Sequence, residues 1–429
     1  MFTSTVPENY TKMSTPFDPA EWVRHLGNNE IWKLDGTTFQ QVPALRSLRL
    51  DGNRLRGVPS EALTGLPHLE VLNIGNNLIA NLPVAAFPPL DKLVVLLMKR
   101  NQISEIAEEA FANLTSLKVL ELDDNFLTQI PTAVTKLAKL QELSISGNRI
   151  KYIRGGLLQK TPALALLELK GNPLTGVDAH AFSFLPRLRK LILSEARELS
   201  TFPNLNGTTA LEILRLDRAG ISSVPSSLCT TCPRLKSLDL KSNKLKTIPD
   251  LNNCREMRVL DLASNHIRSL ENRPFRGMYQ MHDLLLAHNE IQYIPQDAFH
   301  NLSRLQVLNL EDNQISFIHP DAFLPISKIE DLNLGQNVFP HLPSAGLERL
   351  LHLKTFNNPN LREFPPPEEF PRIQTLVLAY AYHCCAFLPL IPSNPPPKAK
   401  DFIVFPDIED IDMNMWNSSL SDYWPSQRK

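Results

Sequence analysis

Five cysteines have the widest range of possible chemistry in this chain, because a thiol can form a disulfide, bind a metal or act as a nucleophile. They are Cys229, Cys232, Cys254, Cys384 and Cys385. Cys229 and Cys254 lie ten and eleven residues after the same position of two successive sequence repeats. If these repeats stack, the two side chains lie next to each other, within reach of one disulfide.

Other states of the cysteines stay open from the residues alone. Cys232 is an alternative partner or a free thiol, and Cys229 and Cys254 could equally be two buried thiols, a common state of cysteine. Cys384 and Cys385 are adjacent and are not expected to bond to each other. No cysteine follows them in the chain.

Motifs of catalysis are not found. His282 and His288 share one segment, MHDLLLAHN, but no third ligand recurs at metal-binding spacing, so both are expected to be solvated polar residues. We find no nucleophile motif, phosphate-binding loop or paired catalytic carboxylates. We therefore expect a protein that is not an enzyme and has no cofactor or metal.

The elements that must position the cysteines follow from a repeated pattern, L-x-x-L-x-L-x-x-N, whose copies are mostly 23 or 24 residues apart. Such a period predicts a leucine-rich-repeat solenoid of the α/β type. We expect a curved parallel β-sheet on the concave face, with short helices, 3-10 turns and loops on the convex face. The copies open at residues 45, 69, 93, 117, 140, 164, 188, 211, 235, 257, 281, 305, 329, 353 and 373.

An asparagine recurs where the chain must bend out of each strand. Its amide can donate to and accept from main-chain groups that would otherwise be buried without partners, so its role is structural. Ala196 and Ala219 replace it in two successive copies, and we expect the curvature to change near residues 195–220. The asparagines are Asn53, Asn77, Asn101, Asn125, Asn148, Asn172, Asn243, Asn265, Asn289, Asn313 and Asn337.

Recurring phenylalanines follow in the second half of many repeats, as in IQYIPQDAFHNL. Their regular recurrence indicates core positions of the convex layer rather than an aromatic ligand stripe. They are Phe87, Phe111, Phe182, Phe275, Phe299 and Phe323.

Three segments are expected along the chain. Residues 1–28 do not scan as a repeat and are expected to be poorly ordered, residues 29–382 should form a solenoid of about 15 repeats, and residues 383–429 read as a flexible hinge-like tail. The N-terminus has neither the apolar region of a signal peptide nor a cysteine cap, and no run of residues is apolar enough to span a membrane. The net charge of -1 gives no overall attraction to nucleic acid or anionic membranes.

The stretch from Leu188 to Leu390 resembles the ectodomain of the leucine-rich-repeat G-protein-coupled receptors, the family of the glycoprotein-hormone and R-spondin receptors. The most specific piece is YAYHCCAF, Tyr380 to Phe387, which is similar to the junction of the last repeat with the hinge. LKTFNNPNLREFPPPEEFPRIQTLVLAYAY and FPNLNGTTALEILRLDRAGISSVPSSLC are most similar to the insect bursicon receptors of this family. The resemblance extends in register from about residue 29 to residue 390.

This resemblance implies a disulfide between Cys229 and Cys254, and identifies Cys384 and Cys385 with the hinge pair whose partners precede the first membrane helix. It implies that the concave face binds a heterodimeric cystine-knot hormone, and that a G protein is reached only through a seven-helix domain. Neither that domain nor the hinge partners are found in this sequence, so the chain is expected to be a truncated, ligand-binding fragment. By resemblance it belongs on the extracellular side of the plasma membrane.

Candidate ligand-binding residues are the variable positions that flank the inward leucines. Their mixture of acidic and basic side chains suits a protein partner, whereas nucleic acid and small-molecule substrates are not expected. The candidates are Arg49, Asp51, Glu121, Asp123, Glu168, Lys170, Arg215, Asp217, Asp239 and Lys241. For any one of them, a solvated strand face without a ligand is the alternative.

Glycosylation sequons are weak support for an extracellular setting, because such triplets also arise by chance. They occur at Asn9, Asn113, Asn206, Asn301 and Asn417. A second function class stays open beside the receptor: a leucine-rich-repeat adhesion, matrix or intracellular scaffold protein that mediates protein–protein interaction.

Overall fold

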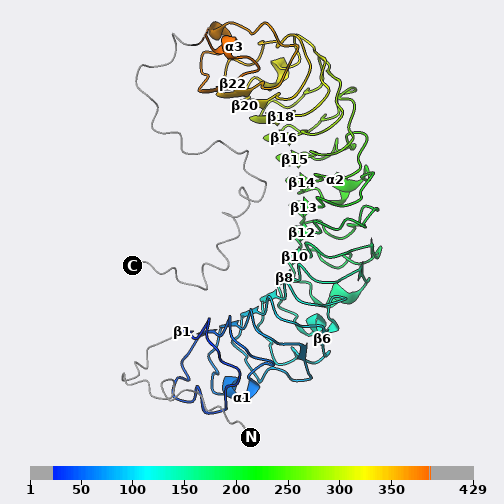
Figure 1. Ribbon diagram of the computed structural model, residues 1–429. Coiled ribbons are helices and arrows are strands. Elements are labelled where there is room, and N and C mark those ends of the chain that lie inside the picture. The colour runs from blue at the N-terminus through cyan, green and yellow to red at the C-terminus, as the bar shows by residue number, and fades with distance from the viewer. Residues whose placement is uncertain (1–22, 386, 388–429) are drawn as a thin grey trace.

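The repeats build one curved stack in the computed structural model, which describes residues 23–385 and 387. The strands of the main sheet lie along the inner side of the arc, and the return segments lie along its outer side (Figure 1). Each strand is short because only its central leucine has to be buried between two neighbours, while the residues on either side point the other way.

All sixteen strands of this sheet run parallel, in chain order among the residues that the structure describes. Equivalent leucines pair from repeat to repeat, as Leu72 does with Leu48 and Leu96. The strands are β1 (Val23–His25), β2 (Ser47–Arg49), β3 (Val71–Asn73), β5 (Val95–Leu97), β7 (Val119–Glu121), β8 (Glu142–Ser144), β10 (Leu166–Glu168), β12 (Lys190–Ile192), β13 (Ile213–Arg215), β14 (Ser237–Asp239), β15 (Val259–Asp261), β16 (Asp283–Leu285), β18 (Val307–Asn309), β20 (Asp331–Asn333), β21 (His352–Lys354) and β22 (Thr375–Val377).

The elements outside the main sheet are also short, with at most five residues each in the described part. Three two-stranded parallel pairs occur in the described part: β4 (Asn81–Leu82) with β6 (Glu105–Ile106), β9 (Tyr152–Ile153) with β11 (Gly176–Val177), and β17 (Tyr293–Ile294) with β19 (Phe317–Ile318). The helices are α1 (Ser60–Leu63), α2 (Leu228–Thr231) and α3 (Ala381–Cys385), and the 3-10 helices are η2 (Thr132–Lys136), η3 (Leu157–Lys160), η4 (Leu324–Ile326) and η5 (Pro367–Glu369). The predicted fold class is confirmed.

The core is one continuous apolar layer between the sheet and the return segments. The six predicted phenylalanines are fully buried in it, and neighbouring rings contact each other, with centroids 6.1 Å apart for Phe87 and Phe111 and also for Phe299 and Phe323. Their prediction as core residues is confirmed. Within the described residues, no helix is long and apolar enough to cross a membrane.

Asparagine side chains satisfy the main chain at the strand ends, as Asn289 illustrates. Its Nδ2 donates to the carbonyls of Leu286 and Ala287 in its own repeat, at 3.1 and 3.2 Å, and to that of Leu262 in the preceding repeat, at 3.0 Å. Its Oδ1 accepts the amide N–H of Ile267 at 3.0 Å. One side chain therefore satisfies four buried main-chain groups, which connects each repeat to the previous one.

Ala196 and Ala219 interrupt this ladder without interrupting the sheet. Strands β12 and β13 stay paired in register, Leu191 opposite Leu214. An asparagine at position 196 would accept a hydrogen bond from the amide N–H of Leu174. With Ala196 in its place, this N–H donates to the carbonyl of Asn172 at 2.8 Å. A change of curvature near residues 195–220 stays a prediction.

One predicted repeat boundary is wrong. Leu353 pairs with Leu332 and Leu376 at the centre of its strand, so this repeat opens at Leu350 rather than at residue 353. Its segment LERLLHLKTF offers leucines in two frames, and Thr355 occupies the third inward position, where the pattern has leucine. Asn358 then continues the ladder, with its Nδ2 donating to the carbonyls of Thr355 and Leu334.

The sheet also begins earlier than residue 29. Strand β1 pairs with β2 and places Arg24 opposite Leu48, and Asn29 donates to the carbonyls of Leu26 and Gly27 like a ladder asparagine. The sheet therefore starts before residue 29, the expected start of the solenoid. The pattern did not reveal this strand because Arg24 occupies the position of the central leucine. Residues 1–22 lie outside the described part, as does the tail from residue 388 onwards.

The described C-terminal end is closed by aromatic side chains around α3. The hydroxyls of Tyr380 and Tyr382 donate to the carbonyls of Pro359 and Arg362, at 2.8 and 2.9 Å. The imidazole of His383 is buried 5.3 Å from the ring of Phe364. These contacts cover the end of the core, while Cys384 and Cys385 remain exposed.

A ladder asparagine should stabilise the fold far more than its exposed neighbours do. Asn289→Ala is expected to lower the free energy of unfolding by about 2–4 kcal/mol, because it leaves buried main-chain groups without partners. Gln314→Ala, which removes an exposed amide next to the ladder, is the matched control. Urea unfolding of both variants checks this. Equal stability of the two would contradict the structural role of the ladder.

Candidate functional site

The concave face is formed by the side chains that alternate with the buried leucines of each strand. Arg49, for example, lies between Leu48 and Leu50, which are fully buried. Because strands stack at roughly 4.8 Å, equivalent side chains on neighbouring repeats form columns along the arc. All ten candidate ligand-binding residues lie on these columns, either in a strand or two residues beyond its end.

The ten candidates fall into three separate groups. Arg49 and Asp51 form a two-contact ion pair near the N-terminal end, with distances of 3.1 and 3.2 Å between guanidinium and carboxylate. The second group lies around β7 to β10 and the third around β13 to β15. Since β2 and β13 are seven strands apart, the first and third groups are separated by roughly 35 Å, the scale of a protein ligand rather than of a small molecule.

The second group is acidic and partly buried. Glu121 pairs with Lys99 of the preceding repeat at 3.2 Å, and Asp123 accepts hydrogen bonds from the Ser144 hydroxyl and the Ser146 amide, both at 2.6 Å. Burial raises the pKa of Asp123 to about 7, an effect that the Ser144 hydrogen bond opposes and the charge of Glu121 reinforces. Burial also raises the pKa of Glu168, against the opposing charges of Lys190 and Lys170.

The third group brings Asp217 and Asp239 together with Asp261, which the sequence did not single out. Burial raises the pKa of Asp239 to about 8, with further contributions from the charges of Asp261 and Asp217. The amide of Lys241, which donates to Asp239 Oδ1 at 3.0 Å, and the charge of Arg215 oppose this rise. The ionised state of Asp239 is therefore disfavoured until a further positive charge approaches.

Asp217 and Lys170 also form contacts with charged neighbours. Asp217 pairs with Arg218 at 2.8 Å, and Arg218 also reaches Glu195 at 3.2 Å. Lys170 lies 3.9 Å from Glu195. Glu121, Lys170 and Asp217 are thus each paired with a charged neighbour.

An apolar patch on the concave face was missed by sequence reasoning. Val71, Val95, Leu97 and Val119 contact each other in a cluster separate from the main core, on β3, β5 and β7. The signal was present, because valine opens three successive strands of the pattern. The acidic group around Asp123 begins directly beside this patch.

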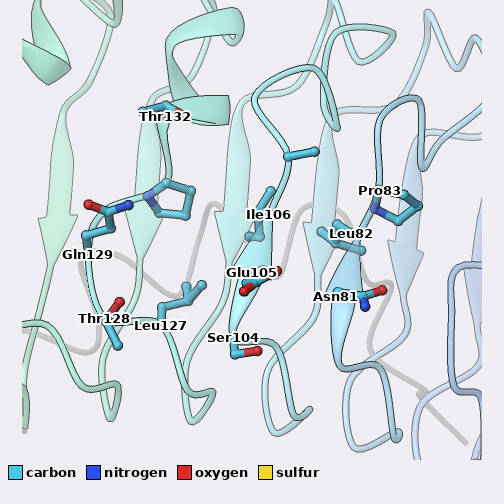
Figure 2. A pocket seen from close by; sticks show the side chains of 12 residues that line it. Asn81, Leu82, Pro83, Ser104, Glu105, Ile106, Leu127, Thr128, Gln129 and Thr132 are labelled. Carbon is cyan, nitrogen blue, oxygen red and sulfur yellow. The ribbon is translucent and has the colours of Figure 1, made fainter.

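The convex side has a groove of about 700 Å³ between the β4–β6 pair and residues 127–132 (Figure 2). Apolar Leu82 and Ile106 line it together with uncharged polar side chains, and Glu105 is the only ionisable residue in its lining. Such a lining contains no acid–base pair. Within residues 23–385 and 387, no three His, Cys, Asp or Glu side chains come together as metal ligands.

The cysteines of α2 and the following repeat form the predicted disulfide. Cys229 and Cys254 are bonded, with their Cα atoms 4.9 Å apart. Cys232 is a buried free thiol. The prediction is confirmed for this pair, and of the two alternatives for Cys232 the structure has the free thiol.

The raised pKa of Asp239 has a measurable consequence for stability. In the fold the carboxyl stays protonated up to about pH 8, whereas in the unfolded chain it ionises above about pH 4, so its contribution to stability is lost as pH rises between these values. Asp239→Asn retains the acceptor for Lys241 and should be more stable than the parent above about pH 9 by at least ~1 kcal/mol. Near pH ~4 the difference should be small.

The matched control is Asp250→Asn, because exposed Asp250 accepts the same type of hydrogen bond from the amide two residues onward, that of Asn252 at 3.3 Å. Thermal unfolding of the three proteins across this pH range measures the difference. Parallel pH profiles for the parent and Asp239→Asn would refute the proposed protonation of Asp239.

Comparison with known proteins places the repeats in a family. The sequence profile described as "Leucine rich repeat" matches residues 25–79, 43–103, 91–150, 138–196, 209–267, 255–315, 279–339 and 303–359. Among solved structures, the chain is similar to a leucine-rich-repeat protein of Leptospira interrogans, with a TM-score of 0.63, 24% identity and coverage of 81% of this chain and 82% of the other. It is also similar to a chain of the Drosophila Toll–Spatzle complex, with a TM-score of 0.68, 22% identity and coverage of 77% and 46%.

Curated relatives include receptors. Over 259 residues the chain is 34% identical to leucine-rich repeat-containing G-protein coupled receptor 5 of Xenopus tropicalis, and 39% identical to receptor 6 of Homo sapiens. These matches cover 60% of this chain and 26% and 24% of the two receptors, so the chain spans about a quarter of their length. The profile matches cover well over half of the sequence, and the chain therefore belongs to the leucine-rich repeat family.

Proposed function

We propose that this chain is the ligand-binding ectodomain of a receptor of the leucine-rich-repeat G-protein-coupled kind. The observation that carries the proposal is the 34–39% identity with such receptors over 259 residues, in a chain that also matches the repeat profile from residue 25 to residue 359 with one interval. In this proposal a seven-helix domain signals to a G protein, and the leucine-rich-repeat solenoid binds the ligand.

The proposed ligand is a heterodimeric cystine-knot hormone of the bursicon type, bound on the concave face. Support comes from the resemblance of LKTFNNPNLREFPPPEEFPRIQTLVLAYAY and FPNLNGTTALEILRLDRAGISSVPSSLC to the bursicon receptors, and from the size and charge of the face. Groups of charges separated by roughly 35 Å suit a ligand with an extended surface. Ion pairs along the face, such as that of Glu121 with Lys99, can exchange partners with charges of a ligand.

Charge and burial on this face favour basic side chains on the ligand. Asp123 and Asp239 have raised pKa values because burial disfavours their ionised forms. A ligand arginine or lysine placed beside them would compensate for that cost and favour ionisation. The apolar patch of Val71, Val95, Leu97 and Val119 borders the acidic group and would form the uncharged part of the same interface.

Direct binding tests this proposal. The full chain, produced through a secretory pathway, is immobilised, and a recombinant bursicon-type heterodimer is passed over it in surface plasmon resonance. Glu121→Gln, on the concave face, should weaken binding about tenfold, which corresponds to ~1.4 kcal/mol. Glu105→Gln makes the same change in the convex groove and should leave the affinity unchanged.

Two results would contradict the proposal at different levels. If the heterodimer binds but both glutamine variants behave like the parent, the concave location of this site is wrong. If the folded chain binds no cystine-knot protein, the hormone assignment is wrong, and an adhesion or scaffold role becomes the better interpretation.

An extracellular location is part of the proposal and makes Asn206 a glycosylation site. Asn206 is exposed and is followed by Gly207, whereas the Nδ2 of Asn113 already donates to the carbonyl of Phe87 at 2.9 Å. Asn301 is half-buried on the convex side, and Asn417 lies outside the described residues.

Peptide mass spectrometry of the secreted chain should find Asn206 converted to aspartate after enzymatic removal of N-glycans, at higher occupancy than Asn113. The reason is that a glycan on Asn113 would compete with its hydrogen bond to Phe87. An unmodified Asn206 in secreted protein would count against this site.

A further inference from the structure

Thr208, Cys232 and Cys254 occupy the same position in three successive repeats. In each case the carbonyl accepts the amide N–H of the residue that opens the next repeat, Leu211, Leu235 and Met257 respectively, always at 3.1 Å. The three side chains therefore form one column on the convex side of the core.

The first two side chains of this column contact each other, because Thr208 Oγ1 lies 3.5 Å from Cys232 Sγ. Cys254 follows Cys232 in the column by the same step of one repeat that separates Cys232 from Thr208. Cys229 lies within α2, Cys232 directly follows this helix, and Cys229 is bonded to Cys254. Cys254 is therefore bonded to one cysteine of C-T-T-C and occupies the same column as the other, one repeat away.

The three sulfurs are shielded from solvent. Cys229, Cys232 and Cys254 are 3%, 0% and 2% exposed. Thiols in solution therefore have little access to the Cys229–Cys254 bond, whereas Cys232 is already beside it. Exchange within the cluster is favoured over reduction from outside, because access decides which thiolate can attack.

We propose that Cys229, Cys232 and Cys254 form one exchange unit, in which Cys254 is bonded alternately to Cys229 and to Cys232. The thiolate of Cys232 attacks Cys254 Sγ, the Cys229–Cys254 bond breaks, and Cys229 leaves as the thiolate. The proton lost by Cys232 is taken up by Cys229 at the end of the step. One disulfide and one thiol are present before and after, so no oxidant or reductant is consumed.

The unit keeps two neighbouring repeats cross-linked in either state. Both bonds join the repeat that opens at Leu211 and contains α2 to the next repeat, which opens at Leu235 and contains Cys254. This link lies one repeat beyond the interruption of the asparagine ladder at Ala219, where the side-chain amide that would connect that repeat to the preceding one is missing. A covalent link with two possible partners would preserve the stack there when one pairing is lost.

Disulfide mapping tests the exchange. Cys229→Ala is produced in the secretory pathway, alkylated in denaturant without reduction, and digested for mass spectrometry. The expected result is loss of the native bond and appearance of a peptide that links Cys232 to Cys254. Cys232→Ala is the matched control and should retain the Cys229–Cys254 link. Two freely alkylated thiols, Cys232 and Cys254, in folded Cys229→Ala would overturn the proposal.

The parent chain provides a test that does not depend on the folding of a variant. Burial raises the pKa of the Cys232 thiol, so native protein is incubated at mildly alkaline pH to increase the fraction of Cys232 thiolate. The reaction is then quenched in acid. The proposal predicts both linked peptides in the digest. A digest that contains only the Cys229–Cys254 link, however long the incubation, would equally overturn it.

Discussion

Burial of main-chain polar groups at the strand ends is the constraint on which this structure depends. The leucines are buried by stacking only if the chain turns out of the strand directly after each short strand. At that turn, main-chain amides and carbonyls are buried in an apolar core and need hydrogen-bond partners. The recurring asparagines resolve this conflict by connecting successive repeats, as Asn289 does with Leu262 and Ile267. The continuous concave face is a consequence, because every strand is kept in register with the next.

The concave face combines charge with burial in a way that favours recognition over catalysis. Its carboxylates lie in columns, so burial and the charges of Asp261 and Asp217 disfavour the ionisation of Asp239, and the charge of Arg215 compensates only in part. A complementary protein surface can supply the missing charges across several repeats at once. The proposed receptor role would account for this arrangement and for the similarity to receptor sequences.

Much of the fold could be predicted from the sequence because each leucine and asparagine has the same surroundings in every repeat. Prediction was wrong where that uniformity ends: LERLLHLKTF allows two frames, and Arg24 replaces the leucine that would have marked β1. The candidate site was less predictable. The raised pKa of Asp239 depends on its burial and on the charge of Asp261 in the next repeat. The sequence around Asp239 does not indicate how deeply its carboxyl is buried.

Hydrogen–deuterium exchange of the full chain, with and without a bursicon-type heterodimer, tests the central claim most directly. The account predicts slower exchange on binding in peptides that contain β7 to β14, together with unchanged exchange in the convex segments around β4 and β6. Protection confined to convex segments, or protection absent at saturating ligand, would contradict recognition by the concave face.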